Sequence, residues 1–158
     1  MTSLAFDVIT KLDGRTLATA ESCTGGGIGN ALTAISGASK VYKGGVISYC
    51  NEVKHDMLNV PSAMLEQFGA VSAPVAEAMA RGARAALKTD AAVSVTGLAG
   101  PSGDEYGNPV GTVYIGYADH RICVSRHFLF SGDRDDVRTQ AVEAALQLIL
   151  ENIRVRGG

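Results

Sequence analysis

The sequence predicts a three-layer α/β/α protein with a mixed, mostly parallel sheet and a late antiparallel strand pair. Three observations favour this class. Helical and β-type patterns alternate through the first part of the chain, glycine-rich turns follow the early strands, and two β-type segments adjoin near the end. With 158 residues, 46% hydrophobic and 19% charged, the chain is expected to form one domain over residues 1–158.

The first half of the chain alternates between the two types of segment. Apolar spacing and breaker residues predict, in order, a helix, a strand, a helix, a strand and two short helices. Their expected ranges are residues 2–13, 16–20, 26–35, 45–49, 51–58 and 61–68.

The second half begins with a long helix for which Ser72 is a plausible N-cap. A buried strand, a loop with five glycines, two strands joined by a short connection, and a final helix that starts at Asp133 are then expected. The ranges for the strands and the loop are 91–96, 97–111, 112–118 and 122–130.

Three glycine-rich or polar turns follow strands, over residues 21–27, 49–54 and 96–103. In open α/β sheets, ligands bind at the carboxyl ends of the strands. If the three strands are parallel, the turns share one edge of the sheet. That edge is therefore the predicted functional site.

The first of these turns combines a serine with a run of glycines at a strand-to-helix junction. The Ser22 hydroxyl would stand beside backbone N–H groups that have no acceptor within the helix. Such a turn can hold an anion, or stabilise the oxyanion of a carbonyl that the hydroxyl attacks. The second interpretation is that Ser22 only caps the helix.

Several familiar motifs are absent. The glycine run fails the G-x-G-x-x-G pattern, because Leu32 or Asn30 stands at the last position. There is no P-loop, and Ser22 does not lie in G-x-S-x-G. The spacing of Cys23, Cys50 and His55 matches no zinc site, so two small buried thiols are the preferred interpretation.

Net charge and cysteine content limit the kinds of binding partner, and the cellular compartment, that we expect for this chain. A net charge of −2 gives no electrostatic footprint for nucleic acid, and no apolar run approaches the about 20 residues that span a bilayer. Three scattered cysteines argue against a disulfide framework and favour a reducing compartment, the cytoplasm. A small molecule is therefore the expected ligand.

Six stretches form a combination more specific than any one of them: residues 19–26 (TAESCTGG), 49–54 (YCNEVK), 69–72 (GAVS), 94–101 (SVTGLAGP), 109–113 (PVGTV) and 130–134 (FSGDR). With this combination the chain closely resembles the C-terminal domain of the CinA family, the nicotinamide-nucleotide amidohydrolases, from about residue 17 to 142. The loop over residues 102–108 departs from the pattern. Many members carry a further N-terminal domain, so the resemblance implies a stand-alone form.

The resemblance implies hydrolysis of the carboxamide of nicotinamide mononucleotide to nicotinate mononucleotide and ammonia, in pyridine-nucleotide salvage. It also implies a serine nucleophile assisted by a lysine and a tyrosine, which correspond to Ser22, Lys54 and Tyr49. It suggests a homodimer and requires neither a cofactor nor a metal.

The implied chemistry places demands on these side chains. Lys54 would have to be uncharged to take the serine proton, so its pKa must fall well below the ordinary value. Tyr49 could relay the proton between Ser22 and Lys54, or donate one to the departing nitrogen. Which of the two accepts the proton stays open.

The glycine turn is expected to supply the oxyanion hole. The candidate donors are the backbone N–H groups of Thr24, Gly25 and Gly26. Glu21 could cap the helix, orient Lys54 or bind a ribose hydroxyl, and the sequence does not choose among these roles.

The substrate's phosphate is expected to lie against the third turn and the start of the last helix. Thr96, Gly97 and the N–H groups of the 97–103 loop, which includes Gly100, could hold it, and Arg134 could pair with it. Arg134 could instead pair with neighbouring aspartates, and Arg138 is a weaker candidate of the same kind.

Two alternatives remain for the function. The chain could be a non-catalytic nucleotide-binding module with a regulatory role related to competence or damage, in which Ser22 only binds phosphate. The nucleophile could also be Cys23, because a thiol at a helix N-terminus can have a lowered pKa.

Overall fold

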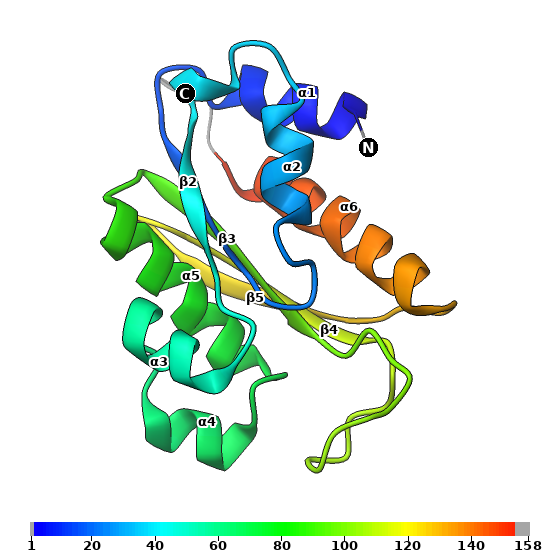
Figure 1. Ribbon diagram of the computed structural model, residues 1–158. Helices are drawn as coiled ribbons and strands as arrows, with labels where there is room; N and C mark the ends of the chain where they lie inside the picture. Colours follow the sequence, from blue (N-terminus) through cyan, green and yellow to red (C-terminus); the bar gives the residue numbers. More distant parts are fainter. Residues whose placement is uncertain (1, 154–158) are drawn as a thin grey trace.

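The protein is described by a computed structural model that covers residues 2–153. Within this range a five-stranded sheet lies between two layers of helices, which confirms the predicted α/β/α class (Figure 1). The elements are α1 (Thr2–Lys11), β1 (Leu17–Glu21), α2 (Gly27–Thr33), the 3-10 helix η1 (Ala38–Lys40), β2 (Tyr42–Ile47), α3 (Asn51–Leu58), α4 (Ser62–Phe68), α5 (Ala73–Leu87), β3 (Ala91–Gly97), β4 (Thr112–Asp119), β5 (Cys123–Leu129) and α6 (Arg134–Asn152).

The sheet has the strand order β2-β1-β3-β4-β5. Its first three strands are parallel, whereas β4 is antiparallel to both β3 and β5. The late antiparallel pair is therefore confirmed. The parallel strands β1, β2 and β3 are those of the part of the chain in which helices and strands alternate. Helices α1, α2 and α6 cover one face, and α3, α4 and α5 cover the other (Figure 1).

The two faces of the sheet carry side chains of different size. Branched side chains such as Leu17 and Val93 pack toward α1, α2 and α6. The opposite face is built from small residues such as Ala18 and Ala92, which lets α5 lie close to the strands. At Gly116 an added Cβ would lie 2.5 Å from a carbonyl oxygen of α5, so this approach requires glycine.

The prediction for β2 was displaced along the chain. A strand was expected over residues 45–49, but it covers Tyr42–Ile47 and pairs with the whole of β1, from Leu17 to Glu21. The sequence of β2 contains two glycines and no continuous apolar run, so its ends could not be read from local composition. Pairing with β1 sets where the strand begins and ends. Tyr49 therefore lies beyond the strand rather than at its last position.

Local sequence signals correctly predicted where two long helices, α5 and α6, begin. Ser72 is the N-cap of α5, although its hydroxyl donates to the Gly69 carbonyl instead of capping the helix. Asp133 caps α6 and forms a capping box with Asp136. None of the helices in residues 2–153 combines the length and apolar character that a membrane crossing requires.

Candidate active site

The carboxyl ends of β1, β2 and β3 meet at one edge of the sheet, as the three turns predicted. A cavity of about 290 Å³ opens there. It is lined by predicted residues from all three turns and from the start of α6: Ser22, Tyr49, Lys54, Thr96, Gly97, Gly100 and Arg134. Segments far apart in the sequence thus form one site because their strands are parallel neighbours.

A serine–lysine pair lies at the bottom of this cavity. Lys54 Nζ is 3.2 Å from Ser22 Oγ and 2.8 Å from the carbonyl oxygen of Ser48. Both side chains are buried, Lys54 at 2% exposure and Ser22 at 7%. The first turn of α3 brings Lys54 under the end of β1, so the amine reaches the hydroxyl without an intermediate group.

Burial lowers the pKa of the Lys54 ammonium below its ordinary value, and the thiols of Cys50 and Cys23 only partly oppose this shift. Within residues 2–153 no carboxylate pairs with Nζ, and its hydrogen-bond partners are Ser22 Oγ and the Ser48 carbonyl. An ammonium has three donors and an uncharged amine has two, with one lone pair. Nζ donates to both oxygens, and the lowered pKa shifts the group toward the uncharged amine, whose lone pair could accept the serine proton.

Glu21 fixes the turn that carries the nucleophile. Its buried carboxylate accepts hydrogen bonds from the Thr24 hydroxyl at 2.6 Å and from the N–H groups of Ile28 and Gly29 at 2.8 and 3.0 Å. A carboxylate at the N-terminus of α2 also interacts favourably with the helix dipole. Of the three roles open from the sequence, the geometry selects the capping carboxylate.

Arg138 holds the same turn from the side of α6. Its guanidinium donates to the carbonyl oxygens of Cys23 at 3.0 Å and of Thr24 at 3.2 Å. The C=O and N–H of a trans peptide point in opposite directions, so the N–H groups of Thr24 and Gly25 point away from Arg138. Arg138 therefore orients two peptide groups beside Ser22 and does not reach the cavity lining.

The predicted oxyanion donors are in different situations. The Gly25 N–H already donates to the Ser22 carbonyl at 3.1 Å. No acceptor within residues 2–153 engages the N–H groups of Thr24 or Gly26. None of the three residues lines the cavity, whose surface at this point is formed by Ser22 and Cys23, so their role in oxyanion binding remains a prediction.

Tyr49 and Arg134 form one side of the cavity mouth. Arg134 donates to the Tyr49 hydroxyl at 3.1 Å and to the Gly100 carbonyl, and within residues 2–153 it makes no ion pair with the neighbouring aspartates. The Tyr49 side chain is exposed and does not lie between Ser22 and Lys54, which contact each other directly. This geometry leaves Tyr49 no relay position between them, while donation to the departing nitrogen stays a prediction.

The third turn also lines the cavity. The Thr96 hydroxyl donates to the Ala70 carbonyl at 2.8 Å, which ties the end of β3 to the segment before α5. The lining also includes Leu98, Ala99 and Ser102 of the 97–103 loop, whose N–H groups were proposed for the phosphate, and three residues for which no role was predicted from the sequence: Asn51, Ala70 and Val71. Asn51, Ala70 and Val71 lie in sequence stretches that carried the family resemblance. The resemblance could therefore have indicated these three residues, but no role was proposed for them.

Of the two cysteines near the site, one is buried as expected and one is not. Cys23 is buried, but Cys50 is exposed, so the prediction of two buried thiols is wrong for Cys50. Burial raises the pKa of the Cys23 thiol to about 11, which opposes its use as a nucleophile at neutral pH. His55 contacts the Val60 carbonyl at 2.9 Å, and no metal-binding cluster occurs in the described part of the chain.

Fold and site together define a class of α/β proteins with a buried serine–lysine pair at the carboxyl ends of three parallel strands. More particularly, the chain belongs to the CinA family, because the sequence model of the CinA C-terminal domain matches residues 2–153. The resemblance of the six sequence stretches is thereby confirmed.

Relatives and solved structures agree with this assignment. A CinA-like protein of Synechococcus sp. (strain RCC307) is 52% identical over 151 residues, and one of Geobacter sulfurreducens is 49% identical over 133. These matches cover 93% and 84% of this chain but 36% and 32% of the relatives, so the chain spans about a third of their length.

Two crystal structures cover nearly the whole chain. The competence/damage inducible protein of Agrobacterium tumefaciens has a TM-score of 0.91 at 38% identity, covering 95% of this chain and 93% of that one. The competence damage-inducible protein A of Klebsiella pneumoniae has a TM-score of 0.93 at 35% identity, with 96% and 95% covered.

Proposed function

We propose that this protein hydrolyses the carboxamide of nicotinamide mononucleotide to nicotinate mononucleotide and ammonia through an acyl-enzyme on Ser22. The observation that carries the proposal is the 3.2 Å contact between Ser22 Oγ and the buried Lys54 Nζ. A serine hydroxyl needs a base within hydrogen-bond reach, and an amine kept uncharged by burial is such a base.

The first half of the reaction forms the acyl-enzyme. Uncharged Lys54 takes the proton of Ser22 Oγ as the oxygen attacks the carboxamide carbon, and the carbonyl oxygen becomes an oxyanion. Unengaged N–H groups of the glycine turn, at Thr24 and Gly26, are the proposed donors to it. The C–N bond then breaks, and the nitrogen leaves as ammonia with the proton that Lys54 had taken. This proton passes either directly or through the Tyr49 hydroxyl, which donates one proton and regains one from Lys54, so the amine is uncharged again.

The second half releases the acid. A water molecule gives a proton to Lys54 and attacks the ester carbon, and the bond from this carbon to Ser22 Oγ breaks. The serine regains its proton from Lys54, and the carboxylate of the product departs. Each proton taken by the amine is thus returned, and no redox step or metal is required.

Recognition of the nucleotide phosphate is assigned to the cavity mouth. Arg134 lies in the lining without a carboxylate partner in residues 2–153, and a guanidinium can bind a phosphate through two N–H groups. Gly97 and Gly100 line the same cavity, and Gly100 contacts Arg134, so backbone N–H groups there can add donors. The same recognition would reject free nicotinamide, which carries the carboxamide but no phosphate.

The decisive measurement is ammonia release from nicotinamide mononucleotide. We expect turnover by the unchanged protein and a loss of about 10³-fold or more in both Ser22→Ala and Lys54→Ala. Circular dichroism shows whether each variant is folded, and Cys23→Ser, which keeps Ser22 and Lys54, is expected to retain turnover.

The outcomes separate the proposal from its main rival. If the unchanged protein binds nicotinamide mononucleotide but releases no ammonia, it is a nucleotide-binding module. Full turnover by folded Ser22→Ala would remove the acyl-enzyme from the mechanism, and loss of turnover in Cys23→Ser alone would transfer the nucleophile to the thiol.

A further inference from the structure

A second hollow, also of about 290 Å³, lies at the other end of the sheet from the Ser22–Lys54 pair. Its position follows from the strand register. Asp119, at the end of β4, pairs with Ala91 at the start of β3, whereas Gly97 at the end of β3 pairs with Val113. The turn between β4 and β5 is therefore at the amino end of β3, away from the cavity.

The hollow is unusually rich in arginine for a chain with a net charge of −2. Arg81 and Arg84 come from α5, and Arg121 comes from the β4–β5 turn beside His120. Three residues apart on a helix, Arg81 and Arg84 lie on the same face. We call these residues, Arg81, Arg84, His120 and Arg121, the arginine hollow.

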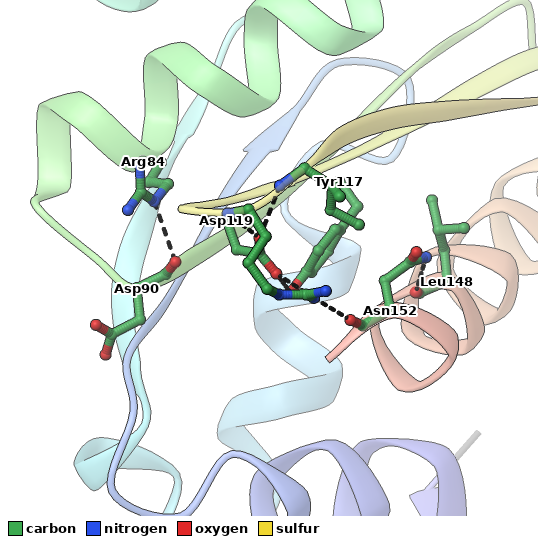
Figure 2. Close-up of polar contacts among 8 residues, drawn as sticks. Arg84, Asp90, Tyr117, Asp119, Leu148 and Asn152 are labelled. Atoms are coloured by element: carbon green, nitrogen blue, oxygen red, sulfur yellow. Dashed lines mark hydrogen bonds and ion pairs between the residues drawn. The ribbon is translucent and has the colours of Figure 1, made fainter. Parts of the chain in front are cut away.

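The two arginines of α5 have no carboxylate partner in residues 2–153. Arg81 donates to Cys123 Sγ at 3.2 Å. Arg84 Nε donates to the backbone carbonyl of Asp90 at 3.0 Å, as Figure 2 shows. The Asp90 carboxylate is instead bound by the backbone N–H and the hydroxyl of Thr16. Both guanidinium groups therefore keep N–H donors and a full positive charge at the hollow.

The third arginine is partly neutralised. Arg121 pairs with Asp119 at 2.9 Å and donates to the Asn152 carbonyl at 2.7 Å. Figure 2 shows the Asp119 carboxylate next to the Tyr117 hydroxyl, 2.7 Å away. Burial opposes ionisation of Asp119, but hydrogen bonds from Tyr117 and from two backbone N–H groups lower its pKa below the ordinary value.

The charge at the hollow follows from these contacts. Three arginines and one aspartate, Asp119, line it, so these four side chains carry a formal net charge of +2. The Glu77 carboxylate lies one helical turn before Arg81 on α5, outside the lining, and accepts from the Ser125 hydroxyl at 2.6 Å. An unpaired guanidinium facing a concave surface is suited to a planar bidentate acceptor.

We propose that the arginine hollow is a binding site for a small phosphate monoester, separate from the Ser22–Lys54 cavity. A phosphate dianion matches the net charge of +2 and offers three acceptor oxygens to the free guanidinium donors. A volume of about 290 Å³ leaves room for a small organic group beside the phosphate. The hollow joins α5 to the β4–β5 turn, so the bound anion would also connect these elements.

The test is a titration followed by backbone amide NMR, with inorganic phosphate and ribose 5-phosphate as separate ligands and sodium chloride as the ionic-strength control. We expect saturable shifts in residues 81–85 and 118–123 for both phosphates, stronger for the ester. Shifts confined to residues 96–103 and Arg134 would instead report the Ser22–Lys54 cavity. Because the readout is binding, the result does not depend on the proposed amidohydrolase activity.

Charge-matched variants locate the site. Arg81→Gln should weaken phosphate binding about tenfold, and Arg81→Gln with Arg84→Gln should abolish it. The control is Arg126→Gln, which removes the same charge from β5 outside the hollow and should change affinity less than twofold at physiological salt, where distant charges are screened.

The proposal has clear failing outcomes. No saturable shift at the hollow with either phosphate up to about 50 mM would overturn it. If Arg126→Gln and Arg81→Gln weakened phosphate binding equally, the binding would reflect the overall charge of the protein and not a specific site. That result would also overturn the proposal. If Arg81→Gln does not fold, Arg81→Lys keeps the charge but loses the planar fork, and it should still bind inorganic phosphate more weakly than the unchanged protein.

Discussion

The Ser22–Lys54 cavity and the arginine hollow have the same volume, about 290 Å³, but the buried Lys54 of the first differs in its protonation equilibrium from Arg81 and Arg84 of the second. Lys54 is 2% exposed, and its burial lowers the pKa of the ammonium, so the fold favours loss of its proton. Arg81 and Arg84 are more accessible and are guanidinium groups, which remain protonated in proteins. The comparison teaches that residue type and depth of burial together decide whether a basic side chain serves as a base or as a cation.

The largest effect on ammonia release is expected when lysine and arginine are exchanged at the two sites. In Lys54→Arg the guanidinium cannot lose its proton, so ammonia release should fall about 10³-fold or more. The reciprocal Arg81→Lys, at the other end of the sheet, should leave ammonia release unchanged within about twofold. Steady-state kinetics with nicotinamide mononucleotide measures both, and an active Lys54→Arg would refute the uncharged base.

A smaller effect is expected where a buried carboxylate supports the nucleophile. Glu21→Gln replaces an acceptor of three hydrogen bonds, so the free energy of unfolding should fall by about 2 kcal/mol. The matched control is Asp135→Asn in the first turn of α6, whose side chain is 91% exposed and which should change stability by less than about 0.5 kcal/mol. Urea denaturation compares the two, and equal changes would contradict the role of Glu21.

The smallest effect concerns the stability cost of Lys54 itself. Its pKa is lowered in the folded state, whereas in the unfolded chain it is about 10.4. Between these two values the unfolded state binds more protons, so the stability of the unchanged protein rises with pH and is lost as pH falls through the folded-state pKa. Lys54→Met, which carries no proton, should be more stable by about 1 kcal/mol near neutral pH.

The pH dependence is the control for that prediction. The advantage of Lys54→Met should shrink as pH rises toward about 10, where the unfolded chain also loses the lysine proton. Thermal or urea unfolding at several pH values measures it. A constant difference across the range would mean that packing, not the buried amine, causes the change.

The sequence by itself determined the α/β/α class, the order of the elements and the edge where the site lies. These depend on local patterns: helical spacing, β-type runs and glycine turns at the ends of strands. Ser22 and Lys54 were proposed as site residues because each lies in a short stretch with a specific family pattern, and the structure places the two side chains in contact. The ends of β2 were missed because pairing with β1, rather than local composition, sets them.

Only the tertiary structure decided which side chains touch. Ser22 and Lys54 lie 32 positions apart, Arg138 and Cys23 lie 115 apart, and the arginine hollow joins α5 to the β4–β5 turn. Such contacts follow from strand order and from the helices that cross over each face, which no local period records. The pKa of Lys54 belongs to the same category, because the loss of hydration that lowers it exists only after the parallel strands and α3 have enclosed the amine.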